Sequence, residues 1–350
     1  MRIVVILAVV CVLLLAPGLG AWGERGHQAV NRAAVRAIPD DGPTFLRAHE
    51  EWIVYLAIIP DSWRSPAEPF LKILEDPNHG WFREQFAFMT DVPRSRYEFV
   101  LALDAEHRRL AAAGDPGAAL TNVRWTGTLP YAAVESYERM VAGMRRYRTA
   151  LAKGGDTRLV ELEIASYLGR LGHYIADGAQ PLHDTIHHDG WQGPNPEGYA
   201  TDPRVHGRFE SQFVELMQLT SDDVQADIPA AVVLPDAFDA VIAHLDDAAA
   251  HVERVYQLDR TGVFTTAGTA KESAEAARVT AEARALMLRQ ISRAATLLRD
   301  LAHTAWVRSA EPPRPDPAGN PMLQTHPQYN PSTGSAPASR QPSKPAERTT

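Results

Sequence analysis

Apolar side chains recur at intervals of three and four residues along most of this chain, and that spacing limits its fold more than any other feature. Residues spaced in this way share one face of an α-helix, which has 3.6 residues per turn. The clearest run follows Pro130, a residue that suits the first turn of a helix, and comprises Tyr131, Val134, Tyr137, Val141, Met144 and Tyr147. Convincing alternation of the kind typical of β-strands does not occur in the sequence. The sequence therefore predicts an all-α fold with a single helical domain.

The same spacing predicts further helices near residues 27–38, 97–113, 159–171, 208–219, 235–255 and 271–306. The last of these is rich in Ala, Leu, Arg and Glu and has no internal Gly or Pro, which favours one long helix. The domain is expected to span residues 22–309, a length that is ample for one large hydrophobic core.

The first 21 residues have the layout of a secretory signal peptide. Arg2 precedes an uncharged apolar run over residues 3–15, and small or helix-breaking residues follow up to Ala21. Cleavage after Gly20 fits almost as well as cleavage after Ala21, and an uncleaved anchor is the alternative. A secreted or periplasmic protein is expected. Its mature form would contain no disulfide, because the only cysteine is Cys11.

Residues 310–350 are dominated by Pro, Ser, Thr, Gln and Ala and lack apolar periodicity, which predicts a disordered tail. Removal of Arg2 with the signal leaves 34 basic side chains against 43 acidic ones, a net charge of about −9. A protein this acidic binds duplex DNA poorly unless something else neutralises the phosphates. Bound metal ions would allow a nucleic-acid substrate nevertheless.

Two pairs of potential metal ligands have a spacing of four residues. His173 and Asp177 form the first pair, and Pro181 follows it and is expected to end that helix. His183, just after the break, is placed where the chain can return it to the same site. His206 and Glu210 repeat the spacing on a later helix, so a binuclear metal site is plausible. One such pair alone is more often a salt bridge or a satisfied core histidine.

Three further polar residues follow His183 closely: His187, His188 and Asp189. They precede a stretch rich in Gly and Pro, which is typical of a solvated loop. We therefore expect these three residues to lie outside the metal site.

Asp61 and Arg64 offer a carboxylate and a guanidinium three residues apart, at the end of an apolar stretch. Beside a metal ion, such a pair suits phosphoryl transfer, because the carboxylate fixes the ion and the guanidinium neutralises developing charge. Without a metal, the same pair is ordinarily a helix cap and an ion pair. His79 stands in an expected turn nearby in the sequence, and its alternative role is that of a loop histidine.

Trp22 would become the first residue if the signal is cut after Ala21. Its free amine and its own carbonyl oxygen could then chelate one metal ion, with His27 as a third ligand. The alternative role of Trp22 is that of a buried aromatic anchor at a helix start.

Taken in chain order, these residues resemble the ligand series of the superfamily that comprises the bacterial zinc-dependent phospholipases C and the fungal and plant single-strand-specific nucleases. The series comprises Trp22, His27, Asp61, His79, His173, Asp177, His183, His206 and Glu210. The resemblance covers about residues 22–215. Its specific part is His-x3-Asp-x5-His, followed by His-x3-Glu, behind an N-terminal Trp.

This resemblance implies a mainly helical fold around three zinc ions. It implies a first zinc held by Asp61, His79, His173 and Asp177, and a second held by His183, His206 and Glu210. Trp22 and His27 would hold the third, with Asp177 bridging to it. It also implies that a zinc-bound water attacks phosphorus in line, with Asp61 and Arg64 as the catalytic residues.

The two branches of the superfamily imply different substrates. The pattern Trp-Gly-x-x-Gly-His and the Asp61–Arg64 pair resemble the nucleases, which favours single-stranded nucleic acid or nucleotides. Glu210, where nucleases usually carry Asp, and the missing Gly-Gly-Asn segment resemble the phospholipases C instead. We expect a nuclease, with a phospholipase C as the alternative and a non-catalytic secreted zinc protein as a third possibility. No stable protein partner is implied.

Overall fold

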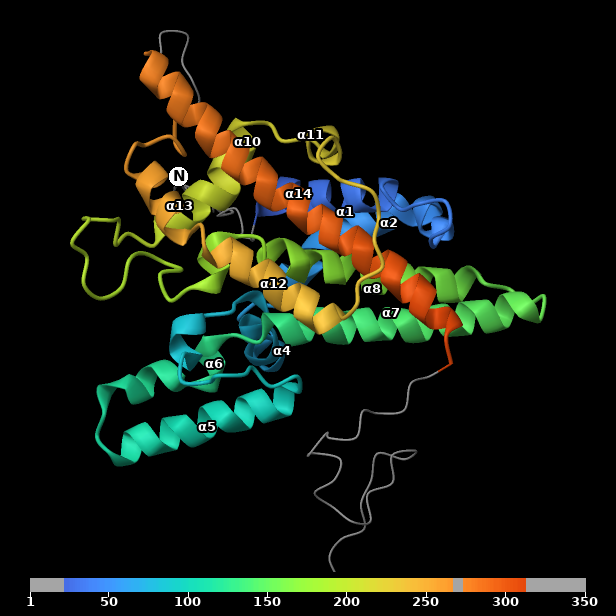
Figure 1. The fold of residues 1–350 in the computed structure, drawn as a ribbon, viewed down its shortest axis with the longest axis horizontal. Helices are drawn as coiled ribbons and strands as arrows, with labels where there is room; N and C mark the ends of the chain where they lie inside the picture. Colours follow the sequence, from blue (N-terminus) through green and yellow to red (C-terminus); the bar gives the residue numbers. More distant parts are fainter. Residues whose placement is uncertain (1–21, 267–272, 313–350) are drawn as a thin grey trace, which may run out of the picture. The chain divides into compact units, whose positions relative to one another are not determined.

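Helices form in nearly all the segments where the apolar spacing predicts them (Figure 1). The computed structural model describes residues 22–266 and 273–312. These residues contain helices, turns and loops but no β-strand. The predicted all-α fold is therefore confirmed.

The helices that carry most of the core are long and amphipathic. They are α1 (Gly23–Arg36), α5 (Arg96–Ala112), α7 (Leu129–Ala152), α8 (Arg158–Asp177), α12 (Ala237–Ala249), α13 (Val252–Asp259) and α14 (Ala274–Ala310). Shorter helices connect them: α2 (Glu50–Tyr55), α3 (Ile59–Ser62), α4 (Pro69–Glu75), α6 (Val123–Thr126), α9 (Arg204–Gly207), α10 (Phe213–Leu216) and α11 (Ser221–Gln225). Two short 3-10 helices matter for the site, η3 (Asp76–His79) and η6 (Pro181–Asp184).

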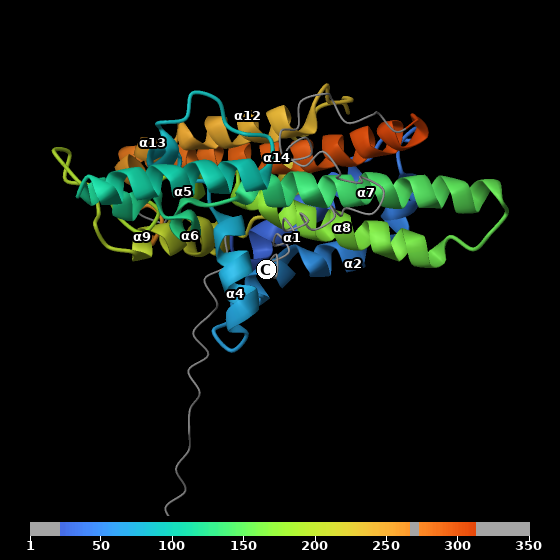
Figure 2. The ribbon, with the colours of Figure 1, turned by 90° about the horizontal axis from the view of Figure 1, so that it is seen from below.

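A central part of the hydrophobic core lies between three helices. Helices α7 and α8 run side by side and α14 packs against both, as the two views agree (Figures 1 and 2). Met140, Leu168 and Leu298 come from these three helices and are fully or almost fully buried in one cluster. Burying side chains of this size contributes about 1.5–3 kcal/mol each. The described residues up to Ala310 belong to one compact unit.

Helix α1 approaches α8 very closely at Gly172. A Cβ atom at this position would lie 1.8 Å from Oδ1 of Asn31, so no larger residue fits. The Asn31 amide is held in turn by hydrogen bonds donated to the carbonyl oxygens of Ile53 and Gly169, both at 2.9 Å. This contact brings His27 of α1 beside His173 of α8.

Two predicted helices differ from the observed ones. The expected helix at 235–255 is divided into α12 and α13, and it starts after Asp236, whose side chain caps the backbone N–H of Asp239. The expected helix at 208–219 begins earlier, with α9, and contains a π-helical segment at Arg208–Gln212. Single π turns in α-helices occur mostly at functional sites.

The predicted signal peptide, residues 1–21, lies outside the described residues, as does the predicted tail from residue 313 onward. In the part of the chain that the structure describes, no helix has the length and apolar character needed to cross a bilayer.

Candidate metal centre

The last turn of α8 presents two of the predicted ligands to the protein interior. His173 and Asp177 are both fully buried, and Nε2 of His173 lies 3.4 Å from Oδ2 of Asp177. The helix ends at Asp177, and η6 begins four residues later at Pro181, which has no N–H to continue a helix. His183 of η6 returns toward α8, with Nδ1 3.9 Å from Oδ2 of Asp177.

Asp61 and His79 complete this first group from two other segments. Oδ1 of Asp61, in α3, lies 3.6 Å from Nε2 of His79 and 3.9 Å from Nε2 of His173. His79, expected in a turn, ends the short 3-10 helix η3 and is buried, which does not fit its alternative role as a loop histidine. The structure thus brings together residues that are more than 100 positions apart in the sequence.

Helix α1 contributes His27 from the opposite side of Asp177. Nε2 of His27 lies 3.4 Å from Oδ1 of Asp177, and its ring stacks on that of His173 at 4.4 Å. Trp22 caps α1 in the left-handed region (φ 50°), and its indole N–H donates to the Ala176 carbonyl oxygen at 2.7 Å. Trp22 is therefore anchored one residue away from Asp177.

Asp177 divides its two oxygens between the two sides, Oδ1 toward His27 and Oδ2 toward His173. A carboxylate in this position can bridge two cations. Among the described residues His27 also groups with Asp61 and His173 as atoms able to hold a metal ion, and His79 groups with His173 and Asp177. The division into a site around His173 and a neighbouring site around His27 and Trp22 therefore stays a prediction.

The ring orientations of three histidines are fixed by backbone carbonyls. Nδ1 of His79 bonds to the Glu75 carbonyl oxygen at 2.9 Å and Nδ1 of His173 to that of Ala57 at 2.8 Å. Nδ1 of His183 bonds to the carbonyl oxygen of His79. Each ring therefore donates its Nδ1–H outward and turns an Nε2 lone pair toward the cluster, as metal-binding histidines do.

The second group consists of His183, His206 and Glu210, all buried. Oε2 of Glu210 lies 2.6 Å from Nε2 of His206 and 3.4 Å from Nε2 of His183, and the two nitrogens are 3.0 Å apart. The ligand atoms of a tetrahedral zinc lie about 3.4 Å from one another, given bonds of about 2.1 Å. The distances of 3.4 Å, 3.6 Å and 3.9 Å in the first group lie near that value. In the second group 2.6 Å and 3.0 Å are the distances of hydrogen-bonded atoms, which would have to separate to admit a metal ion.

The chain matches no protein-family model and no curated protein. The resemblance to the zinc phospholipase and nuclease superfamily therefore stays a prediction. Support for a metal centre comes from the geometry and the chemistry of the clustered side chains themselves.

Several buried atoms at the centre lack a hydrogen-bond partner among the described residues. They are both ring nitrogens of His27, Oδ1 of Asp61, Nε2 of His79, Nε2 of His173 and both carboxylate oxygens of Asp177. A buried polar atom without a partner costs about 1–3 kcal/mol. Cations at the centre would satisfy these atoms except one nitrogen of His27, because a neutral imidazole offers a metal a single lone pair. The residues present therefore fit a metal site.

The electrostatics of the first group favour a cation in the same way. Burial lowers the pKa of His173 to about 3 and that of His27 well below its usual range, so both rings are neutral and keep a lone pair for a metal. Burial also raises the pKa of Asp177 well above normal, and the carboxylates of Asp61 and Glu210 raise it further. Such carboxylates become stable as anions when a positive ion lies between them.

In the second group the negative charge of Glu210 is already paired with a positive charge on His206. Burial by itself would lower the pKa of His206, but Glu210 and Asp189 raise it to about 9. The pKa of Glu210 is held below its usual range by His206 and His183, against the effect of burial. A proton on His206 thus occupies the position that a metal cation would take.

Sequence reasoning misplaced His188. It was expected in a solvated loop, but its ring is partly buried, 4.1 Å from the His206 ring and 5.3 Å from the His183 ring. Asp189 is exposed, yet its Oδ1 lies 3.6 Å from Nδ1 of His206. His188, Asp189 and His206 form a further set of atoms able to hold a metal ion. The sequence signal for this set was the presence of two further ligand-type residues, His188 and Asp189, within six positions of His183.

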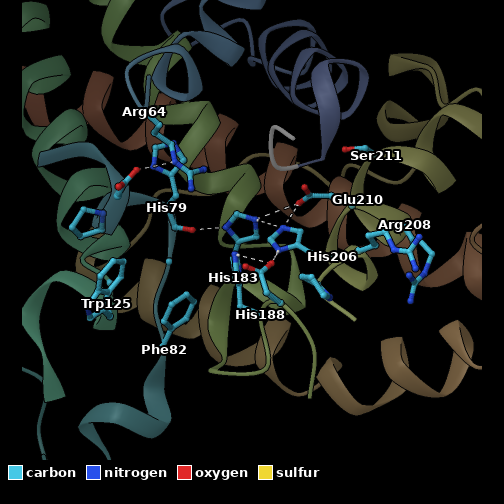
Figure 3. A pocket seen from close by; sticks show the side chains of 18 of the residues that line it. Arg64, His79, Phe82, Trp125, His183, His188, His206, Arg208, Glu210 and Ser211 are labelled. Atoms are coloured by element: carbon cyan, nitrogen blue, oxygen red, sulfur yellow. Dashed lines mark hydrogen bonds and ion pairs between the residues drawn. The ribbon is translucent and has the colours of Figure 1, made fainter. Parts of the chain in front are cut away.

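The second group and His79 of the first group line one cleft of about 1250 Å³, whereas Asp177, His173 and Asp61 lie behind His79 and are not among the lining residues. In Figure 3, Arg64, His79 and Trp125 lie on one side of it, and His206, Glu210 and Arg208 on the other, with His183 between them. Arg64 lines the cleft, and its Nη1 lies 3.5 Å from Oδ1 of Asp61. The ion pair that the sequence suggests for Asp61 and Arg64 is therefore present, and it lies directly beside the metal-ligand cluster.

Proposed function

We propose that the protein is a zinc-dependent phosphodiester hydrolase that acts on single-stranded nucleic acid or nucleotides. The observation that carries this proposal is the buried set of unpartnered ligand atoms around Asp177, which adjoins a cleft that Arg64 lines. Histidine and carboxylate ligands without thiolates suit zinc.

The chain's own residues have distinct tasks in this proposal. Asp61, His79, His173 and Asp177 would hold one ion, His183, His206 and Glu210 a second, and His27 with Trp22 a third. When bound, zinc supplies a Lewis acid and lowers the pKa of water into the neutral range. Arg64 would orient the phosphate and neutralise charge that develops on its oxygens, because its guanidinium is about one-third exposed and faces the cleft.

Asp61 would fix the position of Arg64 as well as a metal ion. Its Oδ1 is shared between Nε2 of His79 at 3.6 Å and Nη1 of Arg64 at 3.5 Å. Asp61 therefore couples the location of the phosphate clamp to that of the metal site. Removing either Asp61 or Arg64 would leave the charge of the other uncompensated beside the metal-ligand cluster.

The cleft walls supply surfaces that suit a base. Phe82 and Trp125 line it, and the indole of Trp125 is 54% exposed. Exposed aromatic rings beside cationic side chains are typical of sites for unpaired bases.

The test is nucleotide release from single-stranded DNA by the purified protein, with zinc and again with chelator. We expect release that the chelator abolishes. His173→Ala should lower the rate at least 100-fold, because the ligand that contacts both Asp61 and Asp177 is lost. His244→Ala, which removes a buried histidine outside the cleft, serves as a matched control that keeps activity. Full activity of His173→Ala in a folded protein would contradict the proposal.

A phospholipase C is the second candidate, and the exposed face of α4 favours it. Phe70, Ile73 and Leu74 are 90%, 53% and 62% exposed, and α4 projects from the helical layers (Figure 2). The same helix carries Lys72 into the cleft. An apolar projection next to a phosphate-binding cleft suits contact with a lipid surface.

Release of choline phosphate from phosphatidylcholine micelles tests this candidate directly. If the chain is a phospholipase, Phe70→Ser with Ile73→Ser should reduce hydrolysis of micelles while leaving that of a soluble short-chain lipid unchanged. A non-catalytic zinc protein, the third possibility, would hydrolyse neither substrate and would bind no inorganic phosphate at its metals, since structural zinc sites are closed.

A further inference from the structure

Asp76 gathers three cationic side chains on one wall of the cleft. Its Oδ1 lies 2.9 Å from Nζ of Lys72 and 3.4 Å from Nε of Arg64, and its Oδ2 lies 3.5 Å from Nη2 of Arg124. The Asp76 side chain is only 15% exposed, whereas each of the three cations is about one-third exposed. Arg64 also pairs with Asp61, so the three cations contact two carboxylates and one positive charge is left over on the side that faces the cleft.

The three cations come from separate parts of the chain. Arg64 follows α3, Lys72 belongs to α4 and Arg124 to α6, and all three line the cleft together with His79. The whole chain has a formal net charge of −8. A local concentration of positive charge in an acidic protein would draw an anionic ligand to this wall.

Trp125 adds a flat apolar surface to the same wall. Its indole is 54% exposed and lines the cleft, and the Arg124 guanidinium lies 5.1 Å from the ring centroid. Gly127 lets this segment pass close to His79, because a Cβ there would lie 2.0 Å from the Gly80 carbonyl oxygen. Figure 3 shows Trp125 on the same side of the cleft as Arg64 and His79.

We propose that Lys72, Arg124 and Trp125 form a second subsite, which binds the phosphate and the unpaired base of the nucleotide next to the scissile bond. The inference rests on the proposed function and narrows its substrate to single strands with at least two phosphates. Arg64 lies between the two subsites, since it contacts Asp61 of the metal cluster and Asp76 of the cationic cluster. A base on the Trp125 ring must be unpaired, and Lys72 and Arg124 supply charge for its phosphate.

The test uses the full-length holoprotein and two readouts. The first is the binding of fluorescein-labelled hexathymidylate with phosphorothioate linkages, followed by fluorescence anisotropy at several salt concentrations. Lys72→Ala with Arg124→Ala should weaken binding about tenfold and lower the slope of log Kd against log salt by about 0.7, the value for one phosphate on a single strand. Trp125→Ala should weaken binding about 5- to 100-fold, and Trp125→Phe should restore most of it.

The second readout is the ratio of kcat/KM for a tetrathymidylate to that for the dinucleoside monophosphate, which has a single phosphate. This ratio should fall about tenfold in the Lys72→Ala, Arg124→Ala variant. Lys153→Ala with Arg158→Ala, a matched pair of exposed cations outside the cleft, and Trp52→Ala, an exposed indole outside it, are the controls and should change neither readout.

The outcomes separate the subsite from the proposed function. If the variants lose binding and the wild-type protein hydrolyses nothing, the result would support the subsite and contradict the hydrolase. Unchanged binding in both variants would overturn the subsite even if the hydrolase stands. The subsite would also be overturned if the wild-type protein bound duplex DNA as tightly as the single strand. The same holds if the variants lost binding to phosphatidylglycerol vesicles but kept binding to the oligonucleotide.

Discussion

Asp177 is the residue on which most of the site depends. One of its oxygens faces His27 and the other faces His173, both at 3.4 Å, and its pKa is raised well above normal by burial and by neighbouring carboxylates. Without a cation this carboxylate would be an unfavourable group to bury. The residue is therefore best explained as a shared metal ligand.

We predict that Asp177→Asn lowers the zinc content from about three ions per chain to about one, because an amide is a poor zinc ligand and both sites around Asp177 lose an anion. Atomic absorption on the purified protein measures this. Asp184→Asn is the matched control, since Asp184 is equally buried and unpartnered in hydrogen bonds but belongs to none of the groups able to hold a metal among the described residues. Equal zinc contents in the two variants would contradict the assignment.

His244 leads to a prediction about pH. It is buried, its Nε2 bonds to the Ile175 carbonyl oxygen at 2.9 Å, and burial lowers its pKa to about 4. A depressed folded-state pKa means that the unfolded chain binds the proton first, at a pKa of about 6.5. Its contribution to stability is therefore full above pH 6.5 and is lost as the pH falls toward 4.

Between pH 7.5 and pH 5 the wild-type protein should lose about 2 kcal/mol more stability than His244→Gln, which keeps an N–H donor but does not titrate. Urea unfolding of both proteins with excess chelator measures the difference. An identical loss in the two proteins would show that the histidine does not titrate as expected.

At the scale of elements, the contact between α1 and α8 positions the two halves of the first metal group. Asn31 cannot move aside from Gly172, because its amide donates to two backbone carbonyls. In most helices a Gly→Ala substitution stabilises by up to about 1 kcal/mol. Here the steric conflict at 1.8 Å outweighs that gain.

We expect Gly172→Ala to destabilise the protein by about 2 kcal/mol or more and to lower its zinc content, because α1 must move away from α8 and take His27 with it. Thermal unfolding and metal analysis test both effects. Gly155→Ala is the control, since a Cβ there meets only the Ala150 carbonyl oxygen at an ordinary 3.4 Å. A stable Gly172→Ala protein with full zinc content would disprove the role of this contact.

The π segment is the other element that matters for the site. It contains Glu210 and follows α9, where His206 lies. The His206–Glu210 spacing of four still brings the two side chains to 2.6 Å. The spacing argument from sequence thus holds for this pair although the helix around it is not a regular α-helix.

At the scale of the whole molecule, processing and metal binding are expected to be linked. Trp22 is fully buried and anchored to Ala176, next to Asp177. If cleavage makes Trp22 the first residue, its free amine would be available as a ligand beside His27. The same nitrogen in an amide bond cannot bind zinc.

A chain that begins at Trp22 should therefore contain about one zinc more than a chain in which Ala21 precedes it. Native mass spectrometry reports both the first residue and the metal content. The two chains should have similar circular dichroism spectra, so that a difference in zinc is not a difference in folding. Equal zinc contents would remove the third ion from the proposed site.

Part of this protein could be predicted from local sequence. The spacing of Tyr131 to Tyr147 gave the position of α7 to within a few residues, because apolar periodicity acts within a single helix. The sequence also predicts that His173 lies beside Asp177 and that His206 lies beside Glu210, because residues four apart are one turn apart on a helix. Breaks in helices, such as that between α12 and α13, were missed because the apolar spacing continues across them.

Local sequence could not decide which segments meet. His79 is predicted as a metal ligand in a turn, but its local sequence does not show that η3 folds against α8. His188 is predicted in a solvated loop, but the turn after η6 packs on His206. The division of the Asp177 oxygens has no signature in residue spacing, and of the three cations around Asp76 only Lys72, four residues before it, has one. The sequence determined which residues share a helix face, because that depends on neighbours within one turn. The tertiary structure alone decided which faces converge on the site, because that depends on close packing between segments more than 100 residues apart, such as those of His27 and Asp177 or of Asp61 and His173.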